Sequence, residues 1–216
     1  MKKTKEVILA FGAHSDDLEI GMGAAIAKFA KDGKEIIGVI FSSGEKSSPW
    51  LKKKYLVESR REEAKNIGGF IGCKQTVFLG LKDMNLMEDI ERPKVKLALK
   101  NIINHFKPEK IFVHSKYDPH KDHRAVNKAV FEALDIIDKD KKISVFVFEV
   151  WNVLNETIPR IYVDVSDTFG IKIKAIKKFK SQKLYIYILM LPVIIRAVIC
   201  GFQAKCKYAE RFYKVR

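Results

Sequence analysis

The chain has 216 residues, of which 47% are hydrophobic and 31% charged, so it is long enough for one folded domain and too apolar for a disordered chain. Its formal net charge is +15, from 41 basic and 26 acidic residues, and such a surface attracts anionic partners. The lysines are spread along the whole chain, however, without a helix-turn-helix pattern or a basic motif interleaved with aromatic residues. This distribution argues against a nucleic-acid-binding protein.

The three cysteines, Cys73, Cys200 and Cys206, are too scattered for a disulfide framework or a Cys-x-x-Cys metal site. The apolar run Val7–Phe11 is too short for the core of a signal peptide, and its continuous apolar character favours a buried strand. These two observations lead us to expect a cytoplasmic protein.

Strand-like and helix-like segments alternate along the chain. The strand over 7–11 is followed by a polar loop over 12–19 and by a small, apolar helix over 20–30. The next segments are predicted as a strand over 36–41, a helix over 51–67 that ends at Gly68-Gly69, a strand over 76–79, a helix over 93–106, a strand over 111–113, a helix over 122–137, strands over 144–150 and 161–165, and helical structure from about 168 to the end.

This alternation is typical of parallel βαβ units. We predict an α/β fold with a doubly wound, Rossmann-like, mostly parallel sheet and helices on both of its faces. One domain would cover 1–216, with a core over 6–150 and a C-terminal strand and helices over 151–216. In such sheets the ligand lies beyond the carboxyl ends of the strands, where the strand order reverses. With the usual order 3-2-1-4, the loops after the first and fourth strands flank that point.

Both of these loops are rich in histidine and aspartate. Imidazole and carboxylate groups together suit a borderline divalent metal such as zinc, which takes three protein ligands at catalytic sites and leaves one position for water. His14 and Asp17 are spaced to face one point, and one histidine of the second loop would complete the set. Asp16 would then suit a general base. The two loops read Ala13-His14-Ser15-Asp16-Asp17-Leu18-Glu19 and His114-Ser115-Lys116-Tyr117-Asp118-Pro119-His120-Lys121-Asp122-His123.

The first loop resembles the A-H-P-D-D-E signature of the PIG-L/LmbE-like zinc-dependent N-deacetylases, and the segment 118–126 resembles their second signature, which ends H-P-D-H-R-x-x. Ser15 and Lys121 stand where that family usually has proline, which loosens the backbone of the loops but removes no reactive group. Weaker similarities extend over about residues 6 to 213, at Gly44-Glu45, Arg61-Glu62-Glu63, Leu79-Gly80-Leu81-Lys82-Asp83, Lys180-Ser181-Gln182 and Tyr208-Ala209-Glu210-Arg211-Phe212.

The resemblance implies a metal ion, zinc or alternatively iron(II), held by His14, Asp17 and His123. It also implies the reaction, which is hydrolytic removal of an acetyl group from the nitrogen of a small, N-acetylglucosamine-like substrate. The sugar would be free, glycosidic or lipid-linked.

The resemblance also assigns catalytic roles. Asp16 would be the general base, and His120 would stabilise the oxyanion or protonate the leaving nitrogen. Asp122 would pair with His120 and hold its tautomer and charge.

Three further residues are candidates for substrate binding. Tyr117 would offer its hydroxyl to the oxyanion or the sugar, or else line the cleft with its ring. Arg61 lies on the predicted helix after the second strand, where a surface role is the alternative, and Asp83 follows the third strand and would bind a sugar hydroxyl. His114 ends the fourth strand, a position typical of a hydrogen-bonded core histidine.

Leu184–Phe202 is the most apolar segment of the chain. Pro192 and Arg196 interrupt it, and its uncharged part over 184–195 is only 12 residues long, too short to span a membrane. We favour a helix buried in the domain or at a subunit contact, which would make the protein a homo-oligomer. A contact of 184–202 with a membrane surface is the alternative.

Two other kinds of protein fit the same loops. A conjugate amidase would keep the metal site and change only the pocket, whereas a two-metal phosphoesterase needs more bridging carboxylates than these loops offer. A catalytically silent binding or membrane-associated protein would keep only the metal. Asp16 and His120 argue against a silent protein, because neither is needed to hold a metal.

Overall fold

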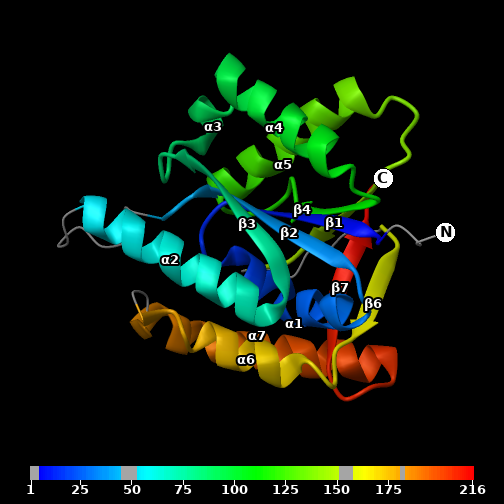
Figure 1. The fold of residues 1–216 in the computed structure, drawn as a ribbon. Helices are drawn as coiled ribbons and strands as arrows, with labels where there is room; N and C mark the ends of the chain where they lie inside the picture. The colour runs from blue at the N-terminus through cyan, green and yellow to red at the C-terminus, as the bar shows by residue number, and fades with distance from the viewer. Residues whose placement is uncertain (1–4, 45–52, 151–157, 181–182) are drawn as a thin grey trace.

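The computed structural model describes residues 5–44, 53–150, 158–180 and 183–216. Within them, one sheet of seven strands has the order β3-β2-β1-β4-β5-β7-β6 (Figure 1). The strands are β1 (Val7–Gly12), β2 (Glu35–Ser42), β3 (Cys73–Leu81), β4 (Lys110–His114), β5 (Ser144–Phe148), β6 (Arg160–Asp164) and β7 (Ala209–Lys214). The helices are α1 (Asp17–Lys31), α2 (Lys53–Ile71), α3 (Leu86–Asp89), α4 (Pro93–Phe106), α5 (Lys121–Ile137), α6 (Phe169–Ile176) and α7 (Lys183–Ala204).

The sheet is parallel from β3 to β5, and only β7 runs against its two neighbours, β5 and β6. The predicted α/β fold and the predicted order 3-2-1-4 are therefore confirmed. Because β2 and β4 both pair with β1, the strand order reverses at β1, and the loops that follow β1 and β4 lie on either side of that point.

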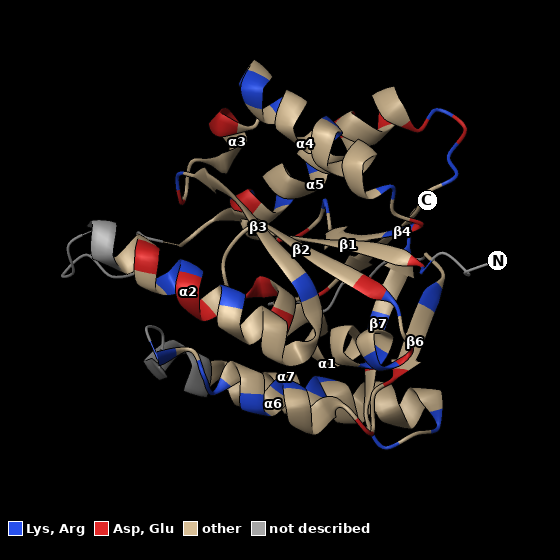
Figure 2. Ribbon diagram, viewed as in Figure 1, with Lys and Arg blue, Asp and Glu red and all other residues tan. Residues whose placement is uncertain are grey.

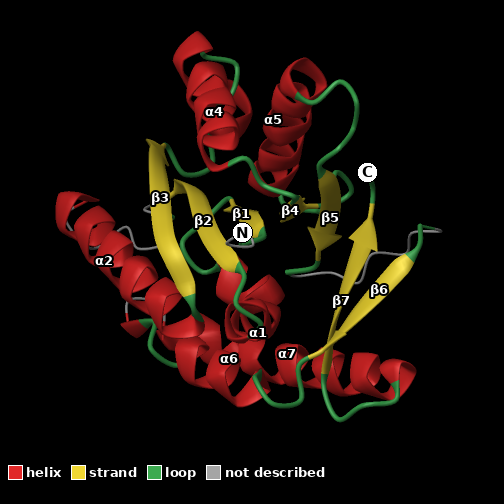
Figure 3. Cartoon of the chain, turned by 45° about the vertical axis from the view of Figure 1, so that its right-hand side comes forward, coloured by secondary structure: helices red, strands yellow, loops and turns green. Residues whose placement is uncertain are grey.

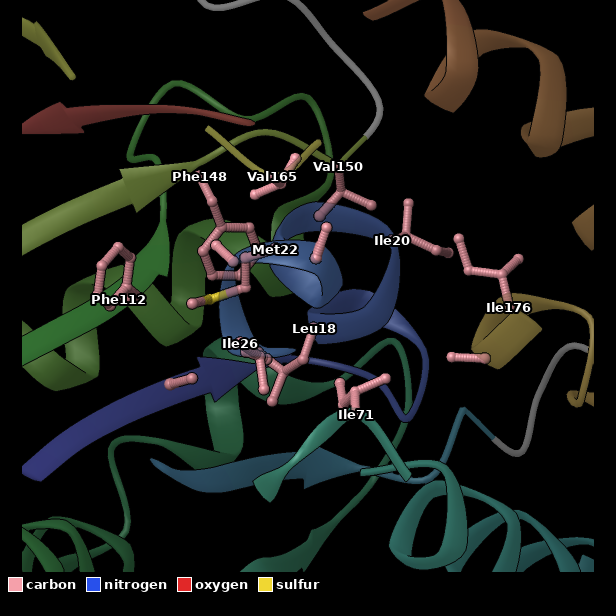
Figure 4. Packing of buried hydrophobic residues seen from close by; sticks show 14 of the residues in the cluster. Leu18, Ile20, Met22, Ile26, Ile71, Phe112, Phe148, Val150, Val165 and Ile176 are labelled. Carbon is pink, nitrogen blue, oxygen red and sulfur yellow. The ribbon is translucent and has the colours of Figure 1, made fainter. Parts of the chain in front are cut away.

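Helices cover both faces of the sheet (Figure 3). The alternating residues of β1 show how: Ile8 and Ala10 are buried in a cluster with side chains of α1, α6 and α7, whereas Leu9 and Phe11 are buried with side chains of α4 and α5. Figure 4 shows the first cluster around α1, where Phe148 of β5 packs close to Met22. Burial on both faces explains why β1 and β2 are continuous apolar runs.

The prediction that the chain is helical from about 168 to its end is wrong, because residues 209–214 form strand β7. Phe212 and Tyr213 are buried on opposite faces of the sheet, so the strand has no alternation of apolar and polar residues that would mark it in the sequence. Gly201 lets the chain fold back from α7 toward this strand, since a Cβ there would lie 2.6 Å from the carbonyl oxygen of Lys207.

Helix α2 also differs from the prediction, because it continues through Gly68 and Gly69 to Ile71. Gly68 serves packing here rather than helix termination, since an added Cβ would lie 2.9 Å from Oγ1 of Thr76 on β3. The turn is made instead by Gly72, whose φ of +105° favours glycine. The predicted start of this helix at residue 51 lies outside the described residues.

Helix α1 is broken at Met22, whose φ of −147° is not helical. The break leaves backbone N–H groups without helical partners. The Glu210 carboxylate of β7 accepts hydrogen bonds from the N–H groups of Ala24 (3.3 Å) and Ala25 (2.7 Å), and the buried Lys172 ammonium of α6 lies 2.5 Å from the same carboxylate. The C-terminal segment thus caps the second half of the helix that begins at Asp17.

We expect Glu210→Ala to lower the free energy of unfolding by about 3–5 kcal/mol, because it leaves the Lys172 ammonium buried without its carboxylate and uncaps α1. Urea unfolding monitored by circular dichroism measures this loss. Glu91→Ala, which removes an exposed carboxylate paired only with surface lysines, is the matched control and should change stability little. Equal stability of the two variants would contradict the structural role of Glu210.

Candidate metal centre

The loops after β1 and β4 meet at the carboxyl edge of the sheet, as the strand order predicts. Ligand atoms of His14, Asp17 and His123 all lie within 4.8 Å of one another, although about 100 residues separate the two loops. The same criterion also groups His14 with His120 and Asp122, and His123 with His114 and Asp118. The three overlapping groups form one histidine–carboxylate cluster.

Asp17 lies at the centre of this cluster. Its Oδ2 accepts a hydrogen bond from the backbone N–H of His14 at 2.7 Å and lies 3.2 Å from Nε2 of His114. Its Oδ1 lies 3.4 Å from Nε2 of His123. Burial opposes its ionisation, but the positive charge of His123, more than any other group, holds the pKa of Asp17 well below its ordinary value. The carboxylate is therefore ionised at neutral pH.

His123 provides the test of whether a metal ion fits. Both ring nitrogens are buried and neither makes a hydrogen bond among the described residues, although Nε2 lies 3.4 Å from Oδ1 of Asp17. Its Nδ1 lies 3.1 Å from Oδ1 of Asp118, the arrangement by which a carboxylate orients a metal-binding histidine. A buried nitrogen without a partner, beside an ionised carboxylate, matches the donor set of a divalent cation. His14, Asp17 and His123 thus fit a metal ion.

The carboxylates of the cluster favour positively charged neighbours, as the raised pKa values of two histidines show. Burial disfavours the protonated form of His123, yet Asp17 and Asp118 raise its pKa to about 9. The pKa of His14 is also raised well above its ordinary value, against its burial, by hydrogen bonds to Asp122, Asp17 and Asp83. Protons on these rings balance the carboxylates here, and a divalent cation would replace them.

Asp16 precedes the first residue of α1, and only 7% of it is exposed. Residues in this position usually cap the helix, but the Asp16 side chain makes no capping hydrogen bond. Burial raises the pKa of Asp16 to about 6, and the neighbouring Asp17 charge adds to the increase. A carboxylate that titrates near neutral pH is suited to accept a proton.

His120 and Asp122 are in contact, but through the backbone. Nδ1 of His120 accepts the N–H of Asp122 at 3.2 Å, which places the proton of a neutral His120 ring on Nε2. The Asp122 carboxylate accepts the N–H of Met84 at 2.7 Å and lies 3.5 Å from Nε2 of His14. The tautomer of His120 is therefore held by a backbone group, whereas the expected pairing used the Asp122 carboxylate.

The structure distributes the three expected substrate-binding residues differently. Asp83 is buried in the cluster, with its Oδ1 3.3 Å from Nε2 of His14. Tyr117 is 61% exposed on the loop after β4, with the Lys116 ammonium 4.8 Å from its ring centroid. Arg61 is half-buried on α2, where its Nε donates to Oγ of Ser43 at 3.3 Å. Only Asp83 contacts a proposed metal ligand.

Arg60 and Asp118 contribute to the site without having been assigned a role from the sequence. The buried Arg60 guanidinium donates to the carbonyl oxygens of Ser43 and Gly44, and its positive charge opposes the rise in the pKa of Asp16. The helical pattern of 51–67 predicts that one side of the helix is buried, but the adjacent Arg61 is as plausible a choice as Arg60 from the sequence alone.

Several hydrogen bonds stabilise the second loop, in which Lys121 stands at the position where the family usually has proline. Oδ1 of Asp118 accepts the N–H of His120 at 2.8 Å, and the Arg124 guanidinium donates to the carbonyl oxygens of Asp118 and Pro119. His114 is fully buried, accepts the N–H of Ala13 at 3.0 Å and stacks on His123 at 3.9 Å between ring centroids. It is a hydrogen-bonded core histidine, as its position predicts.

The fold and the cluster together define an α/β protein with a histidine–carboxylate centre of the kind that binds a divalent cation. The chain belongs to the family described as PIG-L: GlcNAc-PI de-N-acetylase, which matches residues 9–134, more than half of its length. The resemblance carried by the two loops is thereby confirmed.

Individual relatives agree with this assignment. The chain is 29% identical over 180 residues to "Uncharacterized deacetylase YaiS" of Escherichia coli, covering 81% of this chain and 90% of the relative. Its fold is similar to that of N,N'-diacetylchitobiose deacetylase from Pyrococcus horikoshii, with a TM-score of 0.80, 24% identity and coverage of 98% and 84% of the two chains. It is equally similar to the 4-carboxy-2-hydroxymuconate hydratase GalB of Pseudomonas putida, with a TM-score of 0.81, 21% identity and coverage of 98% and 96%. The fold alone therefore does not select the reaction.

We expect His123→Ala to abolish binding of the metal. The variant keeps only His14 and Asp17 as ligands, whereas such a site needs three protein ligands to hold the ion. Metal content after dialysis against zinc or iron(II), measured by plasma mass spectrometry, tests this. His105→Ala, which removes an exposed histidine of α4, should retain the metal. Full occupancy in His123→Ala would mean that the ligand set is wrong.

We expect Asp118→Asn to bind the same metal about 10- to 100-fold more weakly, because the carboxylate that orients His123 is lost while the ligands remain. Competition with a chromophoric chelator gives the affinity. An unchanged affinity would show that Asp118 does not support the centre.

Proposed function

We propose that this protein is a metal-dependent hydrolase that removes an acetyl group from the nitrogen of an N-acetylglucosamine-like substrate. The observation that carries the proposal is the cluster of His14, Asp17 and His123. Asp16, which precedes Asp17 in the chain, adds a buried carboxylate that makes no helix-capping hydrogen bond. A site that only stored a metal would not need this extra carboxylate. The free cysteines Cys73, Cys200 and Cys206 suit the cytoplasmic location that we propose with it.

His14, Asp17 and His123 would hold the ion, which we propose to be zinc, with iron(II) as the alternative. When bound, such an ion polarises an acyl carbonyl and lowers the pKa of a coordinated water. The backbone N–H of His14 fixes the Asp17 carboxylate, and Asp118 lies beside the ring of His123. The protein thereby supplies a preorganised centre for its ligand.

Asp16 would act as the general base. Its pKa of about 6, raised by burial, leaves it ionised at neutral pH and able to accept a proton from the attacking water. A cation in the centre would favour its ionised form further. The carboxylate therefore has the charge state that proton abstraction requires.

His120 would face the developing oxyanion. Burial lowers the pKa of His120, so the ring is neutral at pH 7, and the N–H of Asp122 leaves the ring proton on Nε2. That Nε2–H group can donate a hydrogen bond to the oxygen of the tetrahedral intermediate. The proton that Asp16 removes from the water would then go to the leaving nitrogen, because a neutral His120 ring cannot give up its only proton. Asp122 would position this ring from the backbone and, through its carboxylate, the ring of His14.

The substrate class rests on the family, whose description names an N-acetylglucosamine lipid, and on the diacetylchitobiose deacetylase of similar fold. Asp83 lies in the cluster and would bind a sugar hydroxyl, and the exposed Tyr117 would contact the sugar from the loop after β4. Arg61 would contribute only from the edge of the site, since its guanidinium contacts Ser43.

We expect purified protein to release acetate from one or more of a panel of free, glycosidic and lipid-linked N-acetylglucosamine compounds. A chelator should stop the release and zinc or iron(II) should restore it. Release of a free amine from larger acyl conjugates, without acetate release, would identify a conjugate amidase instead. If metal-loaded protein cleaves neither kind of substrate, a silent binding protein becomes the better description.

We expect Asp16→Asn to keep the fold and the metal but to lose about 100- to 10,000-fold in turnover, because an amide cannot accept the proton. Metal content and the circular dichroism spectrum serve as controls beside the rate of acetate release. Near-normal turnover in this variant would exclude Asp16 as the base.

A further inference from the structure

Helix α7 exposes a continuous apolar stripe. Its exposed large side chains recur every three or four residues, which places them on one side of the helix. Soluble monomers seldom expose apolar side chains in such a contiguous patch, so the stripe calls for an occupant. The α7 stripe consists of Ile188 (68% exposed), Leu191 (63%), Ile195 (48%), Val198 (48%), Ile199 (52%) and Phe202 (87%).

The opposite side of α7 is buried, so the prediction of a buried helix holds for one side of this helix only. Leu189, Val193 and Ala197 pack in the core cluster beneath the sheet. Arg196, the one charged residue between 188 and 202, turns inward and donates to the carbonyl oxygens of Glu149 and Val150, each at 2.8 Å. The α7 stripe is therefore free of charged side chains.

The surroundings of the stripe are basic. Residues 168–209 contain nine lysines or arginines and no aspartate or glutamate. Figure 2 accordingly shows basic but no acidic positions along the described parts of α6 and α7. Exposed lysines lie on both sides of the stripe in the chain, with Lys177 and Lys180 before α7 and Lys205 and Lys207 after it.

We propose that the α7 stripe docks onto an anionic membrane surface, with the apolar side chains among the acyl chains and the flanking lysines at the lipid headgroups. An apolar face bordered by lysines at both ends, with no acidic residue, is the composition of helices that lie in the membrane interface. No helix among the described residues is long and apolar enough to cross a membrane, so the contact would lie in the plane of the surface.

Charge distinguishes this occupant from a second copy of the chain. A two-fold contact through α7 pairs the same surface with itself, which brings the lysines of one copy near those of the other. The exposed Asp164, which contacts Cys206 at one end of the stripe, offsets their charge only in part. Anionic lipid supplies the opposite charge. The docking is independent of the catalytic proposal, because it concerns a surface that no proposed catalytic residue shares.

The test is co-sedimentation of the full-length protein with vesicles of phosphatidylcholine, with and without phosphatidylglycerol. We expect binding to the anionic vesicles that weakens with salt but is not abolished by it, because the apolar contact persists. The variant Leu191→Ser/Ile195→Ser should bind them about tenfold or more weakly, since it removes apolar area from the contact. Its circular dichroism spectrum and thermal unfolding show whether it is folded.

Two controls separate this docking from the attraction of any protein of charge +15 to anionic lipid. Leu97→Ser/Ile136→Ser removes side chains of the same types and similar exposure (58% and 54%) from α4 and α5, and should bind as the unaltered protein does. Lys177→Gln/Lys180→Gln/Lys205→Gln should weaken binding more than Lys94→Gln/Lys107→Gln/Lys139→Gln, which makes the same change in net charge elsewhere.

Three results would overturn the proposal. The first is an absence of vesicle binding by the unaltered protein. The second is an equal loss of binding in each variant and its control, which would indicate attraction by overall charge alone. The third is a stable dimer in sedimentation velocity without lipid that Leu191→Ser/Ile195→Ser converts to a monomer, which would assign the stripe to a second copy.

Discussion

The candidate centre is organised around one buried charge, the carboxylate of Asp17. An ionised carboxylate in the interior is costly unless hydrogen bonds and opposite charges surround it. Here the N–H of His14 and the imidazole of His123 do so, and they come from the segments that follow two different strands. The adjacency of β1 and β4 is therefore a condition for the site, because it brings the second loop against the first.

The same carboxylate explains the electrostatics of its neighbours. Its charge helps to raise the pKa of Asp16 and, with Asp118, that of His123, so that one group opposes ionisation and the other gains a proton. These opposite effects follow from the sign of each group's charge. A divalent cation at His14, Asp17 and His123 would satisfy the need for positive charge, and this is the physical basis for proposing a metal centre.

Residues far along the chain hold this centre in place. Helix α1 begins with Asp17 and breaks at Met22, and Glu210 caps the residues beyond the break from a distance of 185 residues in the sequence. Lys172 in turn depends on Glu210 for its counter-charge. The C-terminal strand is thus part of the support for the metal loops, although it contributes no proposed ligand to them.

The sequence predicted the parts of the molecule that depend on local pattern and strand order. The strands up to β6, the helix over 93–106 and the meeting of the two loops followed from alternation, proline and glycine signals, and the usual order 3-2-1-4. It did not predict β7, because a strand buried on both faces and preceded by a long apolar helix carries no period of its own.

The finer choices within the site depended on tertiary contacts. Adjacent arginines at 60 and 61 look alike in the sequence, and only the packing of α2 against the loop after β2 turns Arg60 inward. Asp122 lies only two residues after His120 in the chain, but the turn before α3 offers its carboxylate the N–H of Met84. Spacing in the sequence indicates which groups are near one another, and backbone geometry decides which of them bond.

Arg196 shows how one contact changes the meaning of an apolar segment. In the sequence it interrupts an apolar run and counts against a membrane contact. In the structure it reaches two carbonyl oxygens after β5, beside Glu149, whose carboxylate also accepts bonds from Arg211 and Tyr213 of β7. Because β5 pairs with β4, on which His114 lies opposite Phe148, these contacts attach α7 to the strand beside the one that carries the second metal loop. The charge that interrupts the apolar run in the sequence therefore points into the domain and leaves the opposite side of α7 wholly apolar.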